Sequence, residues 1–534
     1  MVLVALPAQA QPQRPQEVTL NFLTQGEPDT LDPNRASLAS GALVRQVFEP
    51  LLRFDANLVP QPAAAESYEV SLDGSVYTFH LRQDGRWSDG QPVTAGQFEY
   101  SWKRLLDPKL QAEYAPLFVD AGIIGADDYN RGRTARPDGV GVIAVDDLTL
   151  QVRLNQPFGA LPDLAAMWVG VPLRPDRVGA DPDGWAADPA SYIGNGPFML
   201  SNWVHQDHIT LVPNAQYLAH LGWPRPTLSK VTVSMNTDPE VDYAEFVSGN
   251  TRDWVLVPDA EVNHVLNDPT LAAQARQYNE LTTFWLQFNT AHPPLDNPLV
   301  RRALSKAIDR AALVRDLTAG VSLPTTSVIP PGMPGFQDGL GHELGFDAAG
   351  ARALLAQAGF DAAQPFPNLG FSFDDTHANR RRAEYLQEQL NANARVQVDL
   401  IGMDSSAYDQ ALDARSYDLA FGGWTADYPD PRDWLGPIFG CKSAFNKLSY
   451  CSAALDQTVA RADTGVSLSD RLELYAQAQT QLVQDVPVAP LFGRGRLVLV
   501  KPWIRTTGGS PLVLTPMDDY PGSLFLDKVQ ILPG

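Results

Sequence analysis

Cysteines and paired histidines are the scarcest features of this 534-residue sequence. Only Cys441 and Cys451 are present, in the polar stretch CKSAFNKLSYC, and their spacing is too wide for CxxC redox chemistry. The eight histidines form no HxxxH or HExxH group, so a zinc ion would lack its other ligands. Two free thiols would fit a cytosolic protein, whereas in a secreted chain the simpler interpretation is a disulfide that closes a short surface loop.

Positive charge is also in short supply. The sequence has 40 Lys and Arg against 62 Asp and Glu, which gives a net charge of -22, and no dense basic tract offsets it. Such a chain repels nucleic acid and anionic membrane surfaces, so we expect no nucleic-acid partner. Neither GxSxG nor GxxxxGK[ST] occurs, and the glycines of YIGNGPF, from Tyr192, are not followed by a helix. We therefore expect no enzymatic activity, no cofactor and no metal.

Long apolar runs are missing as well, since no stretch approaches the roughly 18 residues needed to cross a bilayer. The first residues, MVLVALPAQAQPQRPQE, resemble the end of a secretory signal, with a small-residue cleavage site at Ala8-Gln9-Ala10. The basic start of such a signal is absent, so either the true start codon lies upstream, which we favour, or residues 1–16 are only a polar leader. No cysteine follows the cleavage site to carry a lipid anchor. We expect a periplasmic or otherwise extracytoplasmic protein.

The residues that are present describe a folded chain of several domains. The hydrophobic fraction is 44%, with 11 tryptophans, and the length exceeds what one hydrophobic core supports. Thr94 and Gln97 form a capping box that begins a helix with Phe98, Trp102 and Leu105 on one face. This helix belongs to an α+β unit that we place at residues 58–190.

Further along the chain, strands alternate with helices, as in an α/β domain. Asn297-Pro298 is a typical start of a helix, with a capping residue and a proline in its first turn. We expect its apolar stripe to continue to Ala311, with Arg301, Arg302 and Arg310 facing away from the core.

The stretch from Tyr417 to Trp434, YDLAFGGWTADYPDPRDW, is the strongest candidate for a binding site. It begins as a buried strand and contains Gly422-Gly423, and paired glycines in a strand usually mark close approach by another backbone or a ligand. Trp424 and Asp427 follow, and the stiff turn Pro429-Asp430-Pro431 cannot continue a sheet. A carboxylate at the end of an exposed strand edge suits an extended ligand with a positive end. The alternative is that Asp427 only caps the turn.

Six segments, in the same order, closely resemble the extracytoplasmic substrate-binding proteins of oligopeptide ABC transporters, the large peptide- and nickel-binding family 5. They are GEPDTLDP from Gly26, YTFHLRQDGRWSDGQPVTAGQFEYSWKRLLDP from Tyr77, YIGNGPF from Tyr192, FNTAHPPLDNPLVRRALSKAID from Phe288, VIPPG from Val328 and GGWTADYPDP from Gly422. The resemblance covers nearly everything after Val18.

The resemblance implies an α/β, two-lobed periplasmic-binding-protein fold of type II, cluster C, with an additional α+β domain on the N-terminal lobe. The expected division is a leader at 1–16, the first lobe at 17–57, 191–285 and 500–534, the extra domain at 58–190, and the second lobe at 286–499. Ligand would be enclosed when the lobes close. The expected partners are an oligopeptide and the permease subunits of an ABC importer, with the binding protein itself a monomer.

The resemblance also assigns residues to the ligand. Asp427 would pair with the α-ammonium of a peptide, and Gly423 and Thr425 would bond to its backbone as an added strand. Trp424 would form a pocket wall, and Tyr114 would close over the ligand from the extra domain. A sixth residue, Pro28, lies where the loop of the first lobe meets peptide and has only its carbonyl to offer. No basic residue for the C-terminus of the peptide is carried over.

Other functions remain open on this scaffold. Some family members bind nickel complexes or oligosaccharides, and a sugar site would stack aromatic rings without needing Asp427. A peptide-binding chaperone or sensor outside transport would use the same residues. The presence of Asp427 favours peptides.

Overall fold

The structure is a computed structural model that describes residues 16–20, 26–249, 252–465, 467–511 and 526–532. Residues 1–15 of the proposed leader at 1–16 and the end of the expected first strand, Asn21 and Phe22, lie outside these ranges. Within them, no helix is long and apolar enough to cross a membrane.

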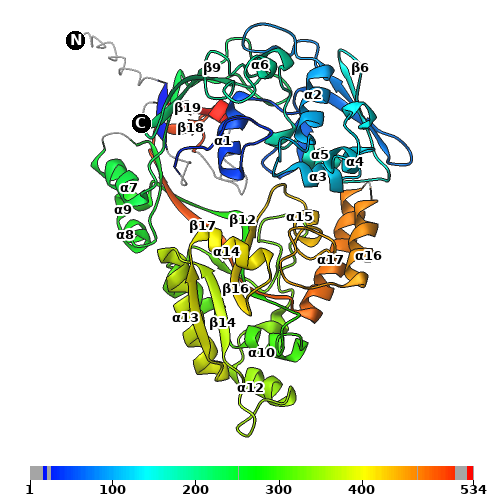
Figure 1. Ribbon diagram of the computed structural model, residues 1–534. Coiled ribbons are helices and arrows are strands. Elements are labelled where there is room, and N and C mark those ends of the chain that lie inside the picture. The colour runs from blue at the N-terminus through cyan, green and yellow to red at the C-terminus, as the bar shows by residue number, and fades with distance from the viewer. Residues whose placement is uncertain (1–15, 21–25, 250–251, 466, 512–525, 533–534) are drawn as a thin grey trace, which may run out of the picture.

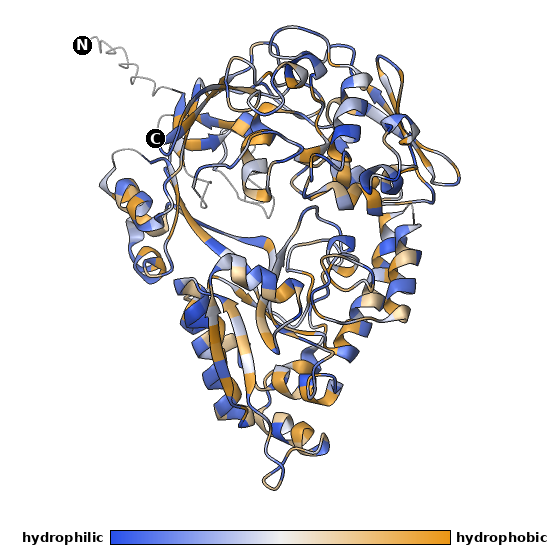
Figure 2. Ribbon diagram, viewed as in Figure 1, coloured by the Kyte–Doolittle hydropathy of each residue, from blue (hydrophilic) through white to orange (hydrophobic). Residues whose placement is uncertain are grey.

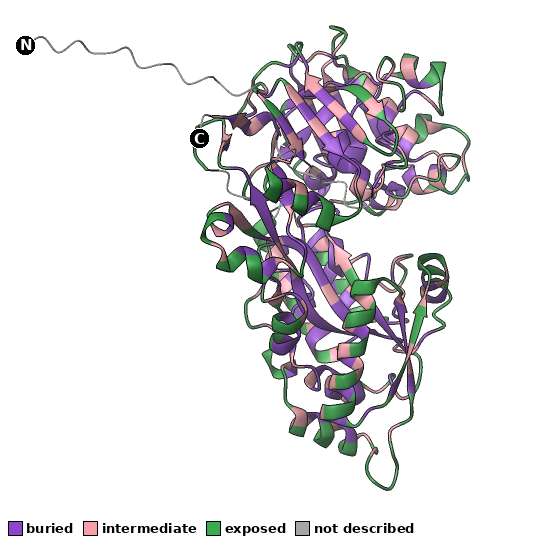
Figure 3. Ribbon diagram, turned by 90° about the vertical axis from the view of Figure 1, so that its left-hand side faces the viewer, coloured by how far each residue is buried: buried purple, intermediate pink, exposed green. Residues whose placement is uncertain are grey.

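The chain folds into two lobes that share one sheet of eleven strands (Figure 1). Two strands, β12 (Ala275–Phe288) and β17 (Val488–Val500), run from one lobe into the other, and their pairing shifts in register between Asn279 and Thr283. In Figure 3, long strands between the lobes are buried along most of their length. The two-lobed fold expected from the sequence is confirmed.

The remaining strands of the large sheet lie on either side of this pair. In the first lobe they are β11 (Trp254–Leu256), β1 (Glu17–Leu20), β10 (Lys230–Ser234), β9 (His208–Pro213) and β8 (Phe198–Val204). In the second lobe they are β16 (Leu419–Thr425), β14 (Leu369–Asp374) and β15 (Val398–Met403), with β13 (Leu323–Pro324) paired to β17.

Helices cover the sheet in both lobes. In the first lobe they are α1 (Leu38–Val47), α7 (Pro239–Ser248), α8 (Val262–Asn267) and α9 (Pro269–Ala272). In the second they are α10 (Pro298–Lys306), α11 (Arg310–Leu317), α12 (Ala348–Gln357), α13 (His377–Ala394), α14 (Ser405–Asp413), α15 (Arg432–Leu435), α16 (Ala453–Asp463) and α17 (Leu468–Asp485). Figure 2 shows apolar residues gathered on the strands and polar residues on the outer sides of the helices.

A second, antiparallel sheet stands on the first lobe. Its strands, in spatial order, are β4 (Ala65–Val70), β5 (Val76–Leu81), β7 (Thr149–Arg153) and β6 (Val142–Asp146). The helices of this part are α2 (Ala95–Leu105), α3 (Ala115–Asp120), α4 (Ala126–Asn130), α5 (Leu161–Leu164) and α6 (Pro175–Ala180). Two short ladders join β2 (Leu52–Phe54) to β3 (Pro60–Pro62) and β18 (Ile504–Thr506) to β19 (Val529–Ile531).

Several local predictions are confirmed. The capping box of Thr94 and Gln97 begins α2, whose Phe98, Trp102 and Leu105 are buried. The alternation of strands and helices expected in the second lobe is present in the order β14, α13, β15, α14 and β16. Cys441 and Cys451 are joined as a disulfide, with their Cα atoms 4.6 Å apart.

One prediction is wrong. The helix that begins at Pro298 ends at Lys306, and Asp309 caps a new helix, so Ala311 is exposed instead of continuing the apolar stripe. Arg301 and Arg310 do not face solvent, since both are buried and donate hydrogen bonds to backbone carbonyls such as those of Val486 and Pro490. The two guanidinium groups thus bond to backbone carbonyls just after α17 and near the start of β17.

Candidate functional site

The turn between β16 and α15 is held by two aspartates other than Asp427. Asp433 accepts hydrogen bonds at Oδ2 from the backbone N–H of Asp427, at 2.8 Å, and from the indole Nε1 of Trp424, at 3.1 Å. Asp430 accepts from the backbone N–H of Arg432, at 2.9 Å. Among the described residues, no backbone N–H donates to the Asp427 side chain. The turn-capping role considered for Asp427 therefore belongs to its neighbours.

Asp427 itself is 7% exposed and lies among other acids. Burial, followed by the charges of Asp433 and Glu113, raises the pKa of Asp427 well above the usual carboxyl range. Burial also raises the pKa of Asp433 to about 7. Arg432, whose charge acts on Asp433, donates instead to Asp463 at 2.8 Å. Among the described residues, Asp427 forms no ion pair with Lys or Arg, so a positive group from outside the chain would be strongly stabilised here.

The strand that leads to Asp427 has an open backbone edge. Ala426 donates its N–H to Leu281 of β12, at 2.8 Å, whereas the carbonyl of Phe421 faces the other way and accepts from the hydroxyl of Tyr408, at 2.6 Å. Since backbone polar groups alternate between the two sides of a strand, those of Gly423 and Thr425 share the direction of Phe421.

Within the described ranges, another strand pairs with that edge only at the start of β16. β14 pairs with β16 only at Leu419 and Ala420. A cavity of about 360 Å³ lies there, lined in part by Gly422 to Thr425 and by Tyr408. An extended ligand could therefore pair with Gly423 and Thr425 without displacing any strand.

The paired glycines have a different local cause from the one expected. A Cβ on Gly422 would lie 2.5 Å from the Trp285 indole nitrogen, and one on Gly423 would lie 2.6 Å from the Phe284 ring. Both aromatic residues belong to β12. The close approach is thus by side chains of the neighbouring strand, and the glycines leave room for them.

The structure brings Trp424 and Tyr114 to the same place as Asp427. Trp424 is half-buried, and its ring packs edge-on against Phe445, with centroids 5.6 Å apart. Tyr114 precedes α3 in the extra unit, packs edge-on against Trp168 at 5.0 Å, and its hydroxyl interacts with the Asp427 carboxyl. Burial raises the pKa of Tyr114, and the charge of Asp427 raises it further. The phenol therefore stays protonated and can donate a hydrogen bond.

Pro28 is buried in the loop after β1. Among the described residues, the Pro28 carbonyl accepts no hydrogen bond from another candidate residue, but the neighbouring Asp29 raises the pKa of Glu113, after the larger effect of burial. The loop of the first lobe therefore comes close to the residue that precedes Tyr114.

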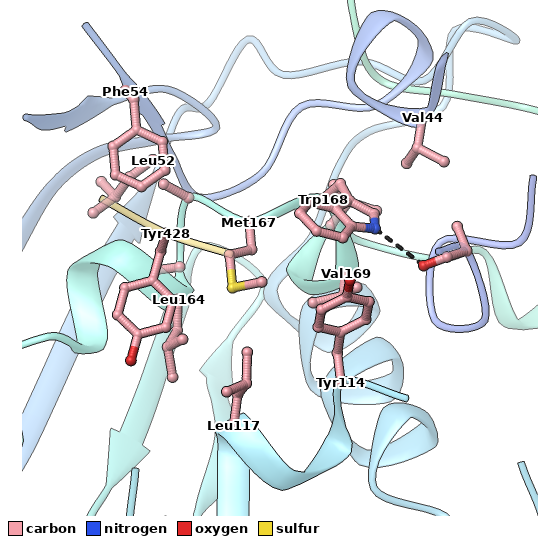
Figure 4. Packing of buried hydrophobic residues seen from close by; sticks show 14 of the residues in the cluster. Val44, Leu52, Phe54, Tyr114, Leu117, Leu164, Met167, Trp168, Val169 and Tyr428 are labelled. Carbon is pink, nitrogen blue, oxygen red and sulfur yellow. Dashed lines mark hydrogen bonds between the residues drawn. The ribbon is translucent and has the colours of Figure 1, made fainter. Parts of the chain in front are cut away.

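The two lobes meet beside this site. Figure 4 shows Tyr428, the residue after Asp427, lying near Leu164 and Met167 of the extra unit, and all three are in one buried cluster. Arg471 of α17 joins the lobes as well, with Nη2 2.6 Å from Oδ2 of Asp430 and Nη1 2.7 Å from the carbonyl of Gly159. The turn that carries Asp427 is thus fixed by contacts across the interface.

Asp433 was missed by the sequence analysis. In the sequence, Asp433 is marked only by its position six residues after Asp427. An acidic residue at that position is equally typical of the first turn of a helix. Its contacts with Trp424 and Asp427 could not be read from that spacing.

Comparisons with known proteins identify the family and support the two-lobed fold. The model for bacterial extracellular solute-binding proteins, family 5, matches residues 59–446. The oligopeptide-binding protein OppA of Bacillus subtilis is 31% identical over 488 residues, covering 89% of this chain and 87% of its own. A probable deoxycholate-binding periplasmic protein, YgiS of Escherichia coli, is 30% identical over 507 residues, covering 94% and 92%. The crystal structure of Haemophilus influenzae OppA in complex with RPPGFSPFR superposes with a TM-score of 0.77 at 25% identity, covering 98% of this chain and 100% of the other.

Proposed function

Since this chain belongs to the bacterial extracellular solute-binding proteins of family 5, we propose that it captures oligopeptides between its lobes and delivers them to an ABC importer. The observation that carries the peptide assignment is the buried Asp427 carboxyl, which lies beside Asp433 and the Tyr114 phenol. A peptide α-ammonium supplies the positive charge that this group of acids lacks, and the open edge of β16 supplies partners for the peptide backbone.

Each of the other candidate residues then has a defined role. Gly423 and Thr425 bond to the ligand main chain, Trp424 forms a wall, and the Tyr114 hydroxyl donates toward the shared carboxylate. Pro28 offers its carbonyl from the first lobe. Ligand is bound and released unaltered, because these roles are positioning and charge pairing and none of them activates a nucleophile.

The cellular setting follows from the same proposal. The protein works as a monomer in the periplasm or outside the cell, is exported through a secretory signal, and docks on the permease subunits. Its domains are a first lobe at 17–57, 191–285 and 500–534, an extra domain at 58–190, and a second lobe at 286–499.

Mass spectrometry of the ligand that co-purifies with the protein tests the assignment. We expect peptides with free N-termini, released on denaturation, and a peptide library incubated with the protein should be recovered with unchanged masses. Recovery of a bile acid, an oligosaccharide or a nickel complex would contradict the peptide assignment, and steady appearance of cleaved products would contradict binding without catalysis.

A further inference from the structure

The hydroxyl of Tyr408 occupies one backbone acceptor on the open edge of β16. Tyr408 lies in α14 and donates its O–H to the carbonyl of Phe421, at 2.6 Å. The side chain is buried in a small cluster with Tyr417 and Ala420. Burial raises the pKa of Tyr408, so the phenol keeps its proton and remains a hydrogen-bond donor. The Phe421 carbonyl is therefore bonded by the protein itself.

Phe421 is also held in place on its other sides. Its ring stacks on that of Phe284, with centroids 5.5 Å apart, and the guanidinium carbon of Arg382 lies 5.7 Å from its ring centroid. Its backbone is paired with Leu286 of β12. Because these contacts fix the residue, its carbonyl stays directed at Tyr408.

The open part of the edge lies between Phe421 and Asp427. Within the described chain, β14 pairs with β16 only at the first two residues of β16. After Phe421, the backbone N–H and carbonyl groups of Gly423 and Thr425 point to the same side, where the 360 Å³ cavity lies. Tyr408 lines this cavity as well, so its hydroxyl stands at the end of the stretch that a ligand can reach.

This arrangement limits how many ligand residues can pair with β16. Asp427 lies two residues after Thr425, so a peptide whose ammonium reaches Asp427 begins opposite Thr425 and runs antiparallel to β16. In an antiparallel pair, every second residue exchanges hydrogen bonds with its partner, which places the third ligand residue opposite Gly423 and the fifth opposite Phe421. The N–H of the fifth residue would therefore meet a carbonyl that already accepts from Tyr408.

We propose that Tyr408 ends the added strand, so that β16 recognises the main chain of only the first four ligand residues. This inference rests on the proposed function, and it makes tri- and tetrapeptides the ligands whose backbone is fully paired. Longer peptides still bind, but from the fifth residue onward their main chain leaves the edge of β16. Tyr408 thus determines specificity for ligand length through the strand edge and not through the side chains of the ligand.

The test uses the pentapeptide that the wild type retains best from a random library, with one amide replaced by an ester to remove a single N–H. An ester between the second and third residues removes the N–H opposite the Gly423 carbonyl. An ester between the fourth and fifth residues removes the N–H opposite the Phe421 carbonyl. Titration calorimetry gives the affinity of each peptide for the wild type, Tyr408→Phe and Tyr408→Ala.

Tyr417→Phe is the matched control. The Tyr417 hydroxyl belongs to the same cluster as Tyr408 and also donates to a backbone carbonyl at 2.6 Å, but this carbonyl is that of Lys447 and not one on β16. Loss of this hydroxyl therefore repeats the chemical change without uncapping the strand edge.

In the wild type and in Tyr417→Phe, the first ester should weaken binding about 3- to 10-fold, the effect of one neutral hydrogen bond, and the second ester should have no effect. The second ester should weaken binding once the Phe421 carbonyl is uncapped, in Tyr408→Phe or, where the ring itself fills the edge, in Tyr408→Ala. Equal effects of both esters on the wild type would overturn the proposal, and so would a second ester without effect in both Tyr408 variants.

Failure of the proposed function gives a different result. If the wild type retains no peptide from the library, the peptide assignment is wrong and the role of Tyr408 falls with it. If peptides bind and neither ester changes the affinity of any of the four proteins, peptide binding stands, and the added strand with Tyr408 at its end is excluded.

Discussion

Asp433 accepts the backbone N–H of Asp427 at 2.8 Å, and this contact helps to hold the turn that follows β16 at the interface between the lobes. The same oxygen accepts from Trp424, so one buried carboxylate positions both the proposed ammonium ligand and the proposed pocket wall.

Replacing Asp433 should therefore weaken peptide binding, although Asp433 is assigned no contact with the ligand backbone. Asp433→Ala removes the acceptor of two buried N–H groups, and we expect peptide affinity to fall about 10- to 100-fold. Asp433→Asn keeps an acceptor oxygen and should lose less. Titration calorimetry of both variants measures this, and equal losses would show that the charge of Asp433 matters and its hydrogen bonds do not.

The ligand-free protein should lose stability as the pH rises from 5 to 8. A carboxyl whose pKa is raised to about 7 in the folded state binds its proton more tightly there than in the unfolded chain. Its stabilising contribution is complete below the unfolded pKa of about 4 and is lost as the pH rises through the folded pKa. In thermal melts, the Tm of Asp433→Asn, whose side chain cannot ionise, should fall less between pH 5 and pH 8 than the Tm of the wild type. An unchanged decrease in that variant would assign the pH dependence to other buried acids, such as Asp163.

Methyl groups on the ligand backbone test the added-strand geometry. Because only alternate residues of β16 face the open edge, N-methylation at successive positions of a bound peptide should weaken binding at every second position. Competition assays with the methylated series give the pattern. Uniform effects along the peptide would mean that the ligand does not pair with Gly423 and Thr425.

The disulfide should contribute to stability and not to binding. Closing a short loop between Cys441 and Cys451 limits the unfolded chain, which the chain-entropy treatment values at about 2–3 kcal/mol. Urea unfolding of the Cys441→Ser, Cys451→Ser double variant should show this loss in the free energy of unfolding, with peptide affinity unchanged. Thiol labelling of the wild type without reductant should modify neither cysteine, and two labelled cysteines would contradict the bond.

The sequence predicted those parts of the fold that depend on local chemistry. Caps, prolines and apolar spacing placed α2 and the start of α10, and the GGWTADYPDP segment located the candidate site. It could not predict contacts between residues far apart in the chain. Arg382 meets Phe284, Phe421 and Phe492 only because α13, β12, β16 and β17 pack together.

The burial of Arg301 and Arg310 was missed for the same reason. Both side chains donate hydrogen bonds to backbone carbonyls in the segment from Val486 to Pro490. The spacing of residues along one helix cannot reveal such contacts. The steric need for the glycine pair of β16 likewise becomes clear only when the rings of Trp285 and Phe284 are seen beside it.

The central claim is that Asp427 binds the α-ammonium of a peptide, and a titration of wild type and Asp427→Ala with one bound peptide and its N-acetylated form tests it most directly. Leaving a buried ammonium without its partner costs on the order of 3–5 kcal/mol, so acetylation should weaken binding to the wild type severely. Asp427→Ala should fold normally, bind the free peptide weakly, and respond little to acetylation, because the partner of the charge is already gone. Equal sensitivity to acetylation in the two proteins would contradict the account.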